Sequence, residues 1–132
     1  MTQHPTTTST RAACGLALAV ALALSSPVSR AADATRGAAA FSTYCAECHS
    51  MKEGKDKKGP SLFAAFGRAA TKHEGFVYSD ALKASGITWT SDKLDAYIAN
   101  PRALVPGGKM KYDGLADAAE RADLVAYLQS VH

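Results

Sequence analysis

The sequence has few cysteines, no long hydrophobic run and no strong excess of charge of one sign. Its longest apolar run, Ala12 to Leu24, is shorter than the roughly 20 residues that a helix needs to cross a bilayer. Its cysteines include one close pair, Cys45 and Cys48, and a structural disulfide framework is therefore excluded. No segment alternates apolar and polar residues as strands do. The sequence therefore predicts an all-α domain with long loops.

The N-terminal segment has the three parts of a secretory signal peptide. Arg11 supplies the basic start, residues 12–24 the apolar centre, and small residues around Pro27 the exit region. Small residues stand at the positions required for cleavage after Ala31 or after Ala34. We therefore expect a signal peptide at 1–32, cut near Ala31 to Ala34, and an exported domain at 33–132. An uncleaved membrane anchor is the alternative.

The expected domain carries almost no net charge. Without Arg11 and Arg30, thirteen basic residues face twelve acidic residues, so binding of nucleic acid through bulk charge is not supported. The basic residues cluster in two segments: Lys52, Lys55, Lys57 and Lys58, then Lys109 and Lys111. The acidic residues gather near the C-terminus: Asp113, Asp117, Glu120 and Asp123. Such lysine runs are either solvated loops or docking surfaces.

Capping residues and helical periodicity predict four helical segments: Ala34 to about Cys45, Ser79 to Ala84, Thr90 or Ser91 to Asn100, and Asp117 to Ser130. Residues 50–76 contain several glycines and a proline, and we expect a loop with tight turns there. Loops of this length are unusual in a small domain unless they wrap around something large and apolar. The expected secondary structure therefore indicates a bound cofactor.

One short motif carries the chemistry. Cys45-Ala46-Glu47-Cys48-His49 is the CxxCH pattern of covalent haem attachment. Two thiols on adjacent turns can reach the two vinyl groups of one porphyrin edge, and the next residue then places an imidazole on the iron. A zinc site would require four ligands, and the sequence has no second CxxC or paired histidine to supply them. Dithiol exchange would require a βαβ setting, and the sequence predicts no strands. The motif therefore predicts one covalent haem c with His49 as an axial iron ligand.

The second axial ligand has four candidates: Met51, His73, Met110 and His132. Met51 follows His49 too closely to reach the opposite ring face. Met110 follows a Pro-Gly-Gly-Lys loop that could present a thioether, while the two histidines stay open. A His/Met pair would fill both axial positions, which favours electron transfer over oxygen or peroxide chemistry.

In order and spacing, residues 33–132 resemble a class I cytochrome c of the bacterial type that is similar to mitochondrial cytochrome c. The resemblance includes Gly37 and Phe41, which in this family cross the C-terminal helix at Leu124 and Tyr127. It implies a small cytochrome c fold, with helices and long loops wrapped round one covalent haem. It implies haem-binding roles for nine residues: Cys45, Cys48, His49, Pro60, Arg68, Tyr78, Trp89, Tyr97 and Met110.

The resemblance also implies what several of these residues do. The carbonyl of Pro60 is expected to accept a hydrogen bond from His49, which fixes the tautomer of the imidazole. Arg68, Tyr78 and Trp89 are expected beside the haem propionates.

The region of the second axial ligand follows the family with two departures. Tyr97 is expected beside the sulfur of Met110, the second iron ligand in this resemblance. Gly108 stands where a threonine is common, so we expect a looser methionine loop. Leu82 stands where an asparagine is common, so we expect a drier or rearranged polar network beside the haem.

The resemblance implies a one-electron carrier rather than an enzyme, working in the periplasm between respiratory or photosynthetic redox complexes. The implied donor is a cytochrome bc complex, and the implied acceptor is a terminal oxidase, a reductase or a reaction centre. Residues 52–58 and 109–111 would dock these partners around the exposed haem edge. We expect a monomer without stable membrane insertion after cleavage. The alternatives are a haem subunit of a periplasmic dehydrogenase complex, and a sensor or peroxidase with an open sixth position.

Overall fold

The computed structural model describes residues 1–2 and 30–132 of the chain. The basic start and the apolar centre of the expected signal peptide fall outside the described residues. Within the described ranges, no helix has the length and apolar character needed to cross a bilayer.

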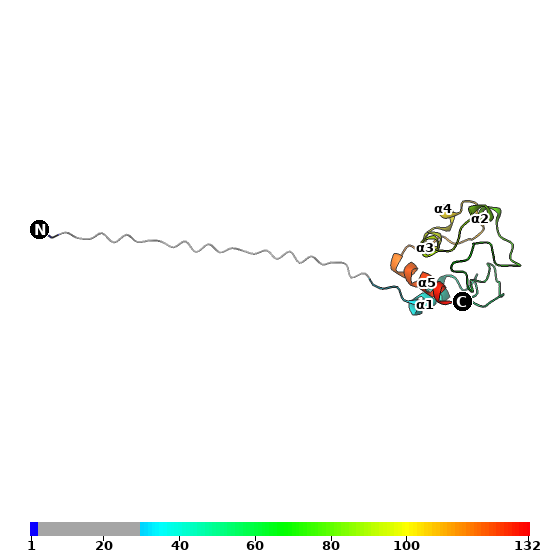
Figure 1. Ribbon diagram of the computed structural model, residues 1–132, viewed down its shortest axis with the longest axis horizontal. Helices are drawn as coiled ribbons and strands as arrows, with labels where there is room; N and C mark the ends of the chain where they lie inside the picture. The colour runs from blue at the N-terminus through cyan, green and yellow to red at the C-terminus, as the bar shows by residue number, and fades with distance from the viewer. Residues whose placement is uncertain (3–29) are drawn as a thin grey trace.

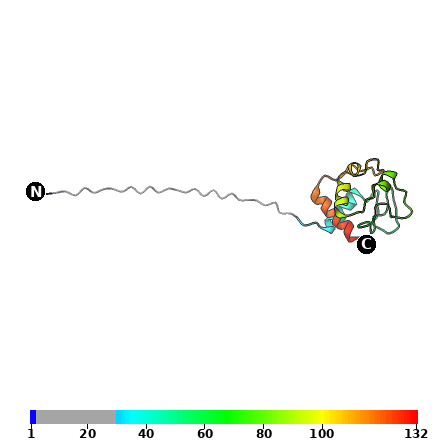
Figure 2. The same ribbon diagram turned by 45° about the horizontal axis from the view of Figure 1, so that its top comes forward.

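The described residues form five short helices joined by loops, which confirms the all-α prediction. In chain order, the helices are α1 (Ala34–Tyr44), α2 (Asp80–Ser85), α3 (Ser91–Ala99), α4 (Pro101–Leu104) and α5 (Ala118–Ser130). Extended backbone in this part of the chain pairs at one isolated antiparallel bridge, between Ala69 and Thr88. Helices α1 and α5 lie side by side, and the long loop between α1 and α2 fills the other side of the domain (Figures 1 and 2).

All five described helices begin at a polar side chain that accepts a hydrogen bond from the first turn. Asp33, Ser79, Thr90 and Asp117 do so for α1, α2, α3 and α5. Gly86 ends α2 with a φ of 62°, a left-handed conformation that glycine adopts at little cost. The helix boundaries predicted from these residues are therefore confirmed.

Asn100 ends α3 and also starts α4. Its backbone N–H donates to the carbonyl of Ala96, and its side-chain oxygen accepts from the N–H of Ala103 at 3.0 Å. Pro101 occupies the start of α4, where its missing N–H would have no partner in the helix anyway. The predicted helix end at Asn100-Pro101 is correct but omits α4, which the same two residues start.

Helices α1 and α5 cross at a point where no side chain separates them. A Cβ atom added to Gly37 would lie 2.0 Å from the carbonyl oxygen of Asp123, so only glycine fits. The rings of Phe41 and Tyr127 pack beside the crossing with centroids 5.7 Å apart. Leu124 is 1% exposed at the centre of the core. The crossing expected from the family resemblance is present.

Backbone hydrogen bonds attach the long loop to the segment before α3. The N–H of Gly67 donates to the carbonyl of Trp89 at 2.9 Å, and the N–H of Ala70 donates to that of Ile87 at 2.8 Å. Nearer α1, the N–H of Leu62 donates to the carbonyl of Ser50. The loop predicted at residues 50–76 is therefore held by backbone hydrogen bonds within itself and to the segment before α3, although it contains no helix.

Candidate haem-binding site

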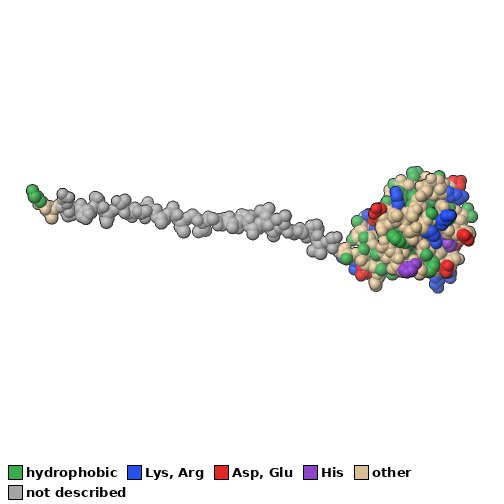
Figure 3. All heavy atoms as spheres, in the orientation of Figure 1, with side chains coloured by type: hydrophobic (Ala, Val, Ile, Leu, Met, Phe, Trp, Pro, Cys, Tyr) green, Lys and Arg blue, Asp and Glu red, His purple; other side chains and the backbone are tan. Residues whose placement is uncertain are grey.

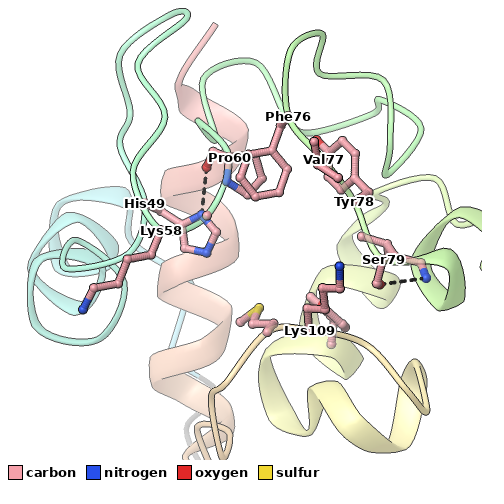
Figure 4. A pocket seen from close by; sticks show the side chains of 12 residues that line it. His49, Lys58, Pro60, Phe76, Val77, Tyr78, Ser79 and Lys109 are labelled. Carbon is pink, nitrogen blue, oxygen red and sulfur yellow. Dashed lines mark hydrogen bonds between the residues drawn. The ribbon is translucent and has the colours of Figure 1, made fainter.

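A cavity of about 220 Å³ lies between the long loop, α2, α3 and the segment after α4. Figure 4 shows the ring of His49 on one side of it and Phe76, Tyr78 and Lys109 on the others. Five of the nine haem-binding residues expected from the sequence line this cavity: His49, Pro60, Tyr78, Tyr97 and Met110. Residues more than 60 positions apart are thus brought to one cavity.

The end of α1 places His49 at the cavity. The backbone N–H groups of Cys48 and His49 both donate to the carbonyl of Cys45, at 3.0 and 2.9 Å, so the chain continues in a tight turn after the helix. Cys45 packs against the core, and both thiols are free. Cys45 therefore lies one turn before His49 and Cys48 directly before it, which brings both thiols to the same side of the cavity edge as the histidine.

His49 is held in one tautomer by Pro60. Its Nδ1 lies 2.8 Å from the Pro60 carbonyl oxygen (Figure 4). Because a carbonyl only accepts hydrogen bonds, Nδ1 carries the proton and Nε2 keeps its lone pair. Burial also lowers the pKa of His49, which favours the neutral imidazole that a metal ion binds.

Gly59 fixes the position of the His49 ring, a role that was not predicted from the sequence. A Cβ atom on Gly59 would lie 2.4 Å from Cε1 of His49 and 2.8 Å from Nδ1. The backbone of the loop therefore packs directly on the face of the imidazole. The signal in the sequence is that this glycine directly precedes Pro60, the residue that binds the ring.

The chemistry of the cysteines favours haem attachment over the two alternatives. Burial, with a smaller contribution from Cys48, raises the pKa of Cys45 to about 11. Dithiol oxidoreductases depend on the opposite shift, a lowered thiol pKa. A zinc site would need further ligands, and residues 30–132 contain no group of three or more Cys, His, Asp or Glu side chains placed to hold a metal.

Met110 and Tyr97 line the cavity together with Leu82. Burial raises the pKa of Tyr97, so its phenol is neutral. Leu82 adds apolar surface at the position where the family resemblance leads us to expect an asparagine. Gly108 is involved in a tight turn, because its N–H donates to the carbonyl of Val105 at 3.0 Å. This hydrogen bond restrains the methionine loop without a threonine hydroxyl.

Trp89 and Arg68 do not line this cavity. The ring of Trp89 packs on Tyr97 with centroids 5.0 Å apart. The guanidinium of Arg68 donates to the carbonyl of Phe63 at 3.3 Å. Burial raises the pKa of Tyr78, and the charge of Arg68 acts against this shift. Contacts of Arg68 and Trp89 with haem propionates stay predictions.

His73, one of the candidates for the second axial position, lies outside the cavity lining. Its Nε2 lies 2.7 Å from Oδ1 of Asp56, and the same carboxylate oxygen accepts from the N–H of Ser61. The pair joins two parts of the long loop. His73 therefore has a structural partner, whereas Met110 faces the cavity.

Charged side chains surround the cavity mouth, but they are not all of one sign. Lys58 and Lys109 line the cavity, and Lys58 pairs with Glu47. On the face shown in Figure 3, basic and acidic side chains are interspersed over the domain. Asp123 does not belong to an acidic surface cluster: it is 2% exposed and pairs with Arg30 and Arg36. Of the four acidic residues near the C-terminus, Asp123 is therefore buried and paired rather than part of a charged surface.

A covalent-haem motif at the edge of an apolar cavity, in a small helical domain, defines a c-type haem protein. The protein-family model for cytochrome c matches residues 34–132. The chain is 47% identical over 98 residues to the cytochrome c of Stellaria longipes, which covers 74% of this chain and 91% of that protein. It is 43% identical over 99 residues to the cytochrome c2 of Rhodopila globiformis, covering 75% of this chain and 93% of that protein.

A solved structure supports the same assignment. The fold matches cytochrome cH from Methylobacterium extorquens with a TM-score of 0.69 and 38% sequence identity, covering 74% of this chain and 98% of that chain. The chain therefore belongs to the cytochrome c family. It carries one covalent haem c through its CxxCH motif, and it is an electron carrier rather than an enzyme.

Proposed function

We propose that the chain is a periplasmic carrier that moves single electrons between redox complexes through a haem held by His49 and Met110. The observation that carries this proposal is the cavity that both residues line, with the Nε2 lone pair of His49 kept free by Pro60. The bound haem supplies the Fe(III)/Fe(II) couple. The protein supplies two fixed axial ligands and an apolar enclosure, and this combination raises the reduction potential.

The other residues of the site hold the cofactor in place. Cys45 and Cys48 form the thioethers, so the haem cannot be lost outside the cytoplasm. We place Tyr97 beside the thioether of Met110, and the fact that both line one cavity supports this placement. Arg68, Tyr78 and Trp89 bind the propionates; the proximity of Arg68 to Tyr78 supports this role.

We assign export to the N-terminal segment, with a signal peptide over about residues 1–32 that is cut near Ala31 to Ala34, and the cytochrome c domain over residues 33–132. The start of α1 supports this boundary, because its capping residue is Asp33.

The partners we propose are a cytochrome bc complex as donor and a terminal oxidase, reductase or reaction centre as acceptor. Lys58 and Lys109 support docking at the haem edge, because they line the mouth of the cavity from two different segments. The lysines at 52–57 and Lys111 extend the same basic region in the sequence. Complementary charge would orient the encounter and raise its rate.

The absorption spectrum of the oxidised protein tests the His49/Met110 ligation. We expect a thioether–ferric charge-transfer band in the wild type, lost in Met110→Ala and kept in the matched control Met51→Ala. Met51 packs against the core and does not line the cavity. If the band is absent from the wild type, or survives in Met110→Ala, Met110 is not the ligand and the carrier mechanism proposed here fails.

A further inference from the structure

The sequence offers two cleavage positions, after Ala31 and after Ala34, which both have small residues at −1 and −3. We propose that the mature protein begins at Ala32 and that Asp123 is the anchor for its new N-terminus. This inference rests on the export proposed above. It depends on a cluster of contacts that the electron-transfer site does not use.

Asp123 holds the start of the domain from the opposite helix. It lies on α5, yet its Oδ1 accepts a hydrogen bond from the backbone N–H of Asp33 at 2.7 Å. Its Oδ2 accepts from Nε of Arg36 at 2.8 Å, and Nη2 of Arg36 donates to Oδ1 at 2.9 Å. The guanidinium of Arg30 also donates to Oδ2. A carboxylate buried this deeply needs these partners, because an unpaired buried charge is strongly destabilising.

Cleavage after Ala34 would remove the centre of this cluster. Asp33 would leave with the signal peptide, and Asp123 would lose the N–H that binds Oδ1. The cap of α1 would be lost as well, because Oδ1 of Asp33 accepts from the N–H of Arg36 at 2.9 Å. The new α-ammonium at Thr35 would stand in the first turn of α1, where the positive end of the helix dipole disfavours a positive charge.

Cleavage after Ala31 keeps these contacts. Hydrolysis adds one water across the peptide bond: Ala31 leaves with the new carboxylate, and Ala32 keeps the amino group, which is protonated at neutral pH. Within residues 30–132, this cut removes two polar contacts: the Arg30 pair with Asp123, and the hydrogen bond from Nη2 of Arg36 to the Ala31 carbonyl. The side chain of Arg30 is 54% exposed, and Asp123 keeps its hydrogen bonds from Arg36 and from the Asp33 N–H when Arg30 leaves.

The new ammonium group can replace the charge that departs. Ala32 directly precedes Asp33, whose N–H already contacts Asp123, and consecutive Cα atoms are about 3.8 Å apart. A positive charge is thereby kept beside the buried carboxylate when Arg30 is removed.

A reciprocal pair of precursor variants tests the inference, with the intact mass of the haem-loaded exported protein as the readout. Ser29→Leu places a bulky residue at −3 of the Ala31 site, and Ala32→Leu does the same to the Ala34 site. We expect wild type to begin at Ala32, Ala32→Leu to be cut at the same bond, and Ser29→Leu to accumulate as precursor or begin at Thr35. If wild type begins at Thr35 instead, and Ala32→Leu rather than Ser29→Leu changes the cut, the inference is overturned and the export proposal stands. A wild-type chain that keeps its first residues would instead contradict both.

Stability gives a second measurement. We expect a domain starting at Thr35 to melt at least about 5 °C below one starting at Ala32, since it lacks the cap and the bond to Asp123. Asp123→Asn should reduce this difference in melting temperature, because the domains starting at Ala32 and at Thr35 then no longer differ in an ion pair with a buried carboxylate. An equal difference in both backgrounds would show that Asp123 does not anchor the N-terminus.

Discussion

Gly59→Ala directly tests the claim that loop backbone positions the axial histidine. The added Cβ would lie 2.4 Å from Cε1 of His49, about 1 Å inside an ordinary contact, so the ring or the loop must move. Insertion of a methyl group into a packed site usually costs about 1–3 kcal/mol. The displacement also affects the 2.8 Å hydrogen bond from Nδ1 of His49 to Pro60, which sets the tautomer and basicity of the ligand.

The assay for Gly59→Ala combines urea unfolding with the reduction potential and the visible spectrum of the haem-loaded protein. Gly37→Ala is the matched control, because its Cβ would lie 2.0 Å from the Asp123 carbonyl oxygen at the α1–α5 crossing. We expect both variants to lose stability, but only Gly59→Ala to shift the potential and the spectrum. Unchanged haem properties in Gly59→Ala, or equal shifts in both variants, would refute the positioning role of Gly59.

Three further predictions concern other parts of the fold. Hydrogen bonds from Arg36 lower the pKa of Asp123 to about 2, below its value of about 3.9 in an unfolded chain. The stability that the ionised Asp123 provides is therefore complete above about pH 4 and is lost as the pH falls towards 2. The free energy of unfolding of Asp123→Asn, measured as the pH is lowered, should lack this loss of stability between about pH 4 and 2. Asn100→Ala should cost about 1 kcal/mol in urea unfolding, because the cap of α4 is lost. Electron transfer with an acidic partner should slow as salt rises, and a rate that is insensitive to ionic strength would remove the lysine-docking proposal.

Local signals in the sequence predicted the helices well. Asp33, Ser79, Thr90 and Asp117 each use a side-chain oxygen within their own turn, so the residue type alone marks the helix start. The hydrogen bond between His49 and Pro60 spans eleven positions, and it is anticipated through the resemblance to the cytochrome c family rather than from the local pattern.

Interactions between distant segments explain what the sequence did not reveal. Asp123 looks like one more surface carboxylate in the sequence, because Arg36 lies 87 positions away and only the α1–α5 crossing brings them together. The close approach of Gly59 to the His49 ring likewise depends on how the loop folds back. The capping side chain of Asn100 is visible in the sequence. The proline after it marks the end of α3, but it is also a favoured first residue of a helix, so α4 was not predicted.

Backbone hydrogen bonds hold the segment that carries Met110 on both sides, and this limits how far the Met110 thioether can move during electron transfer. Before it, the N–H of Gly108 donates to the carbonyl of Val105 at 3.0 Å. After it, the N–H of Leu115 donates to the carbonyl of Ile98 at 3.0 Å, which ties the chain to the end of α3.

Gly114 brings this second attachment close to α3. Its φ is 111°, and a Cβ there would lie 2.1 Å from the carbonyl oxygen of Ala99, so the contact requires glycine. A thioether held between two such fixed points has little freedom to shift when the charge of a bound iron changes. With His49 fixed by Pro60 and Gly59 on the other side, both proposed ligands are positioned by backbone contacts, which is the condition for electron exchange with little reorganisation.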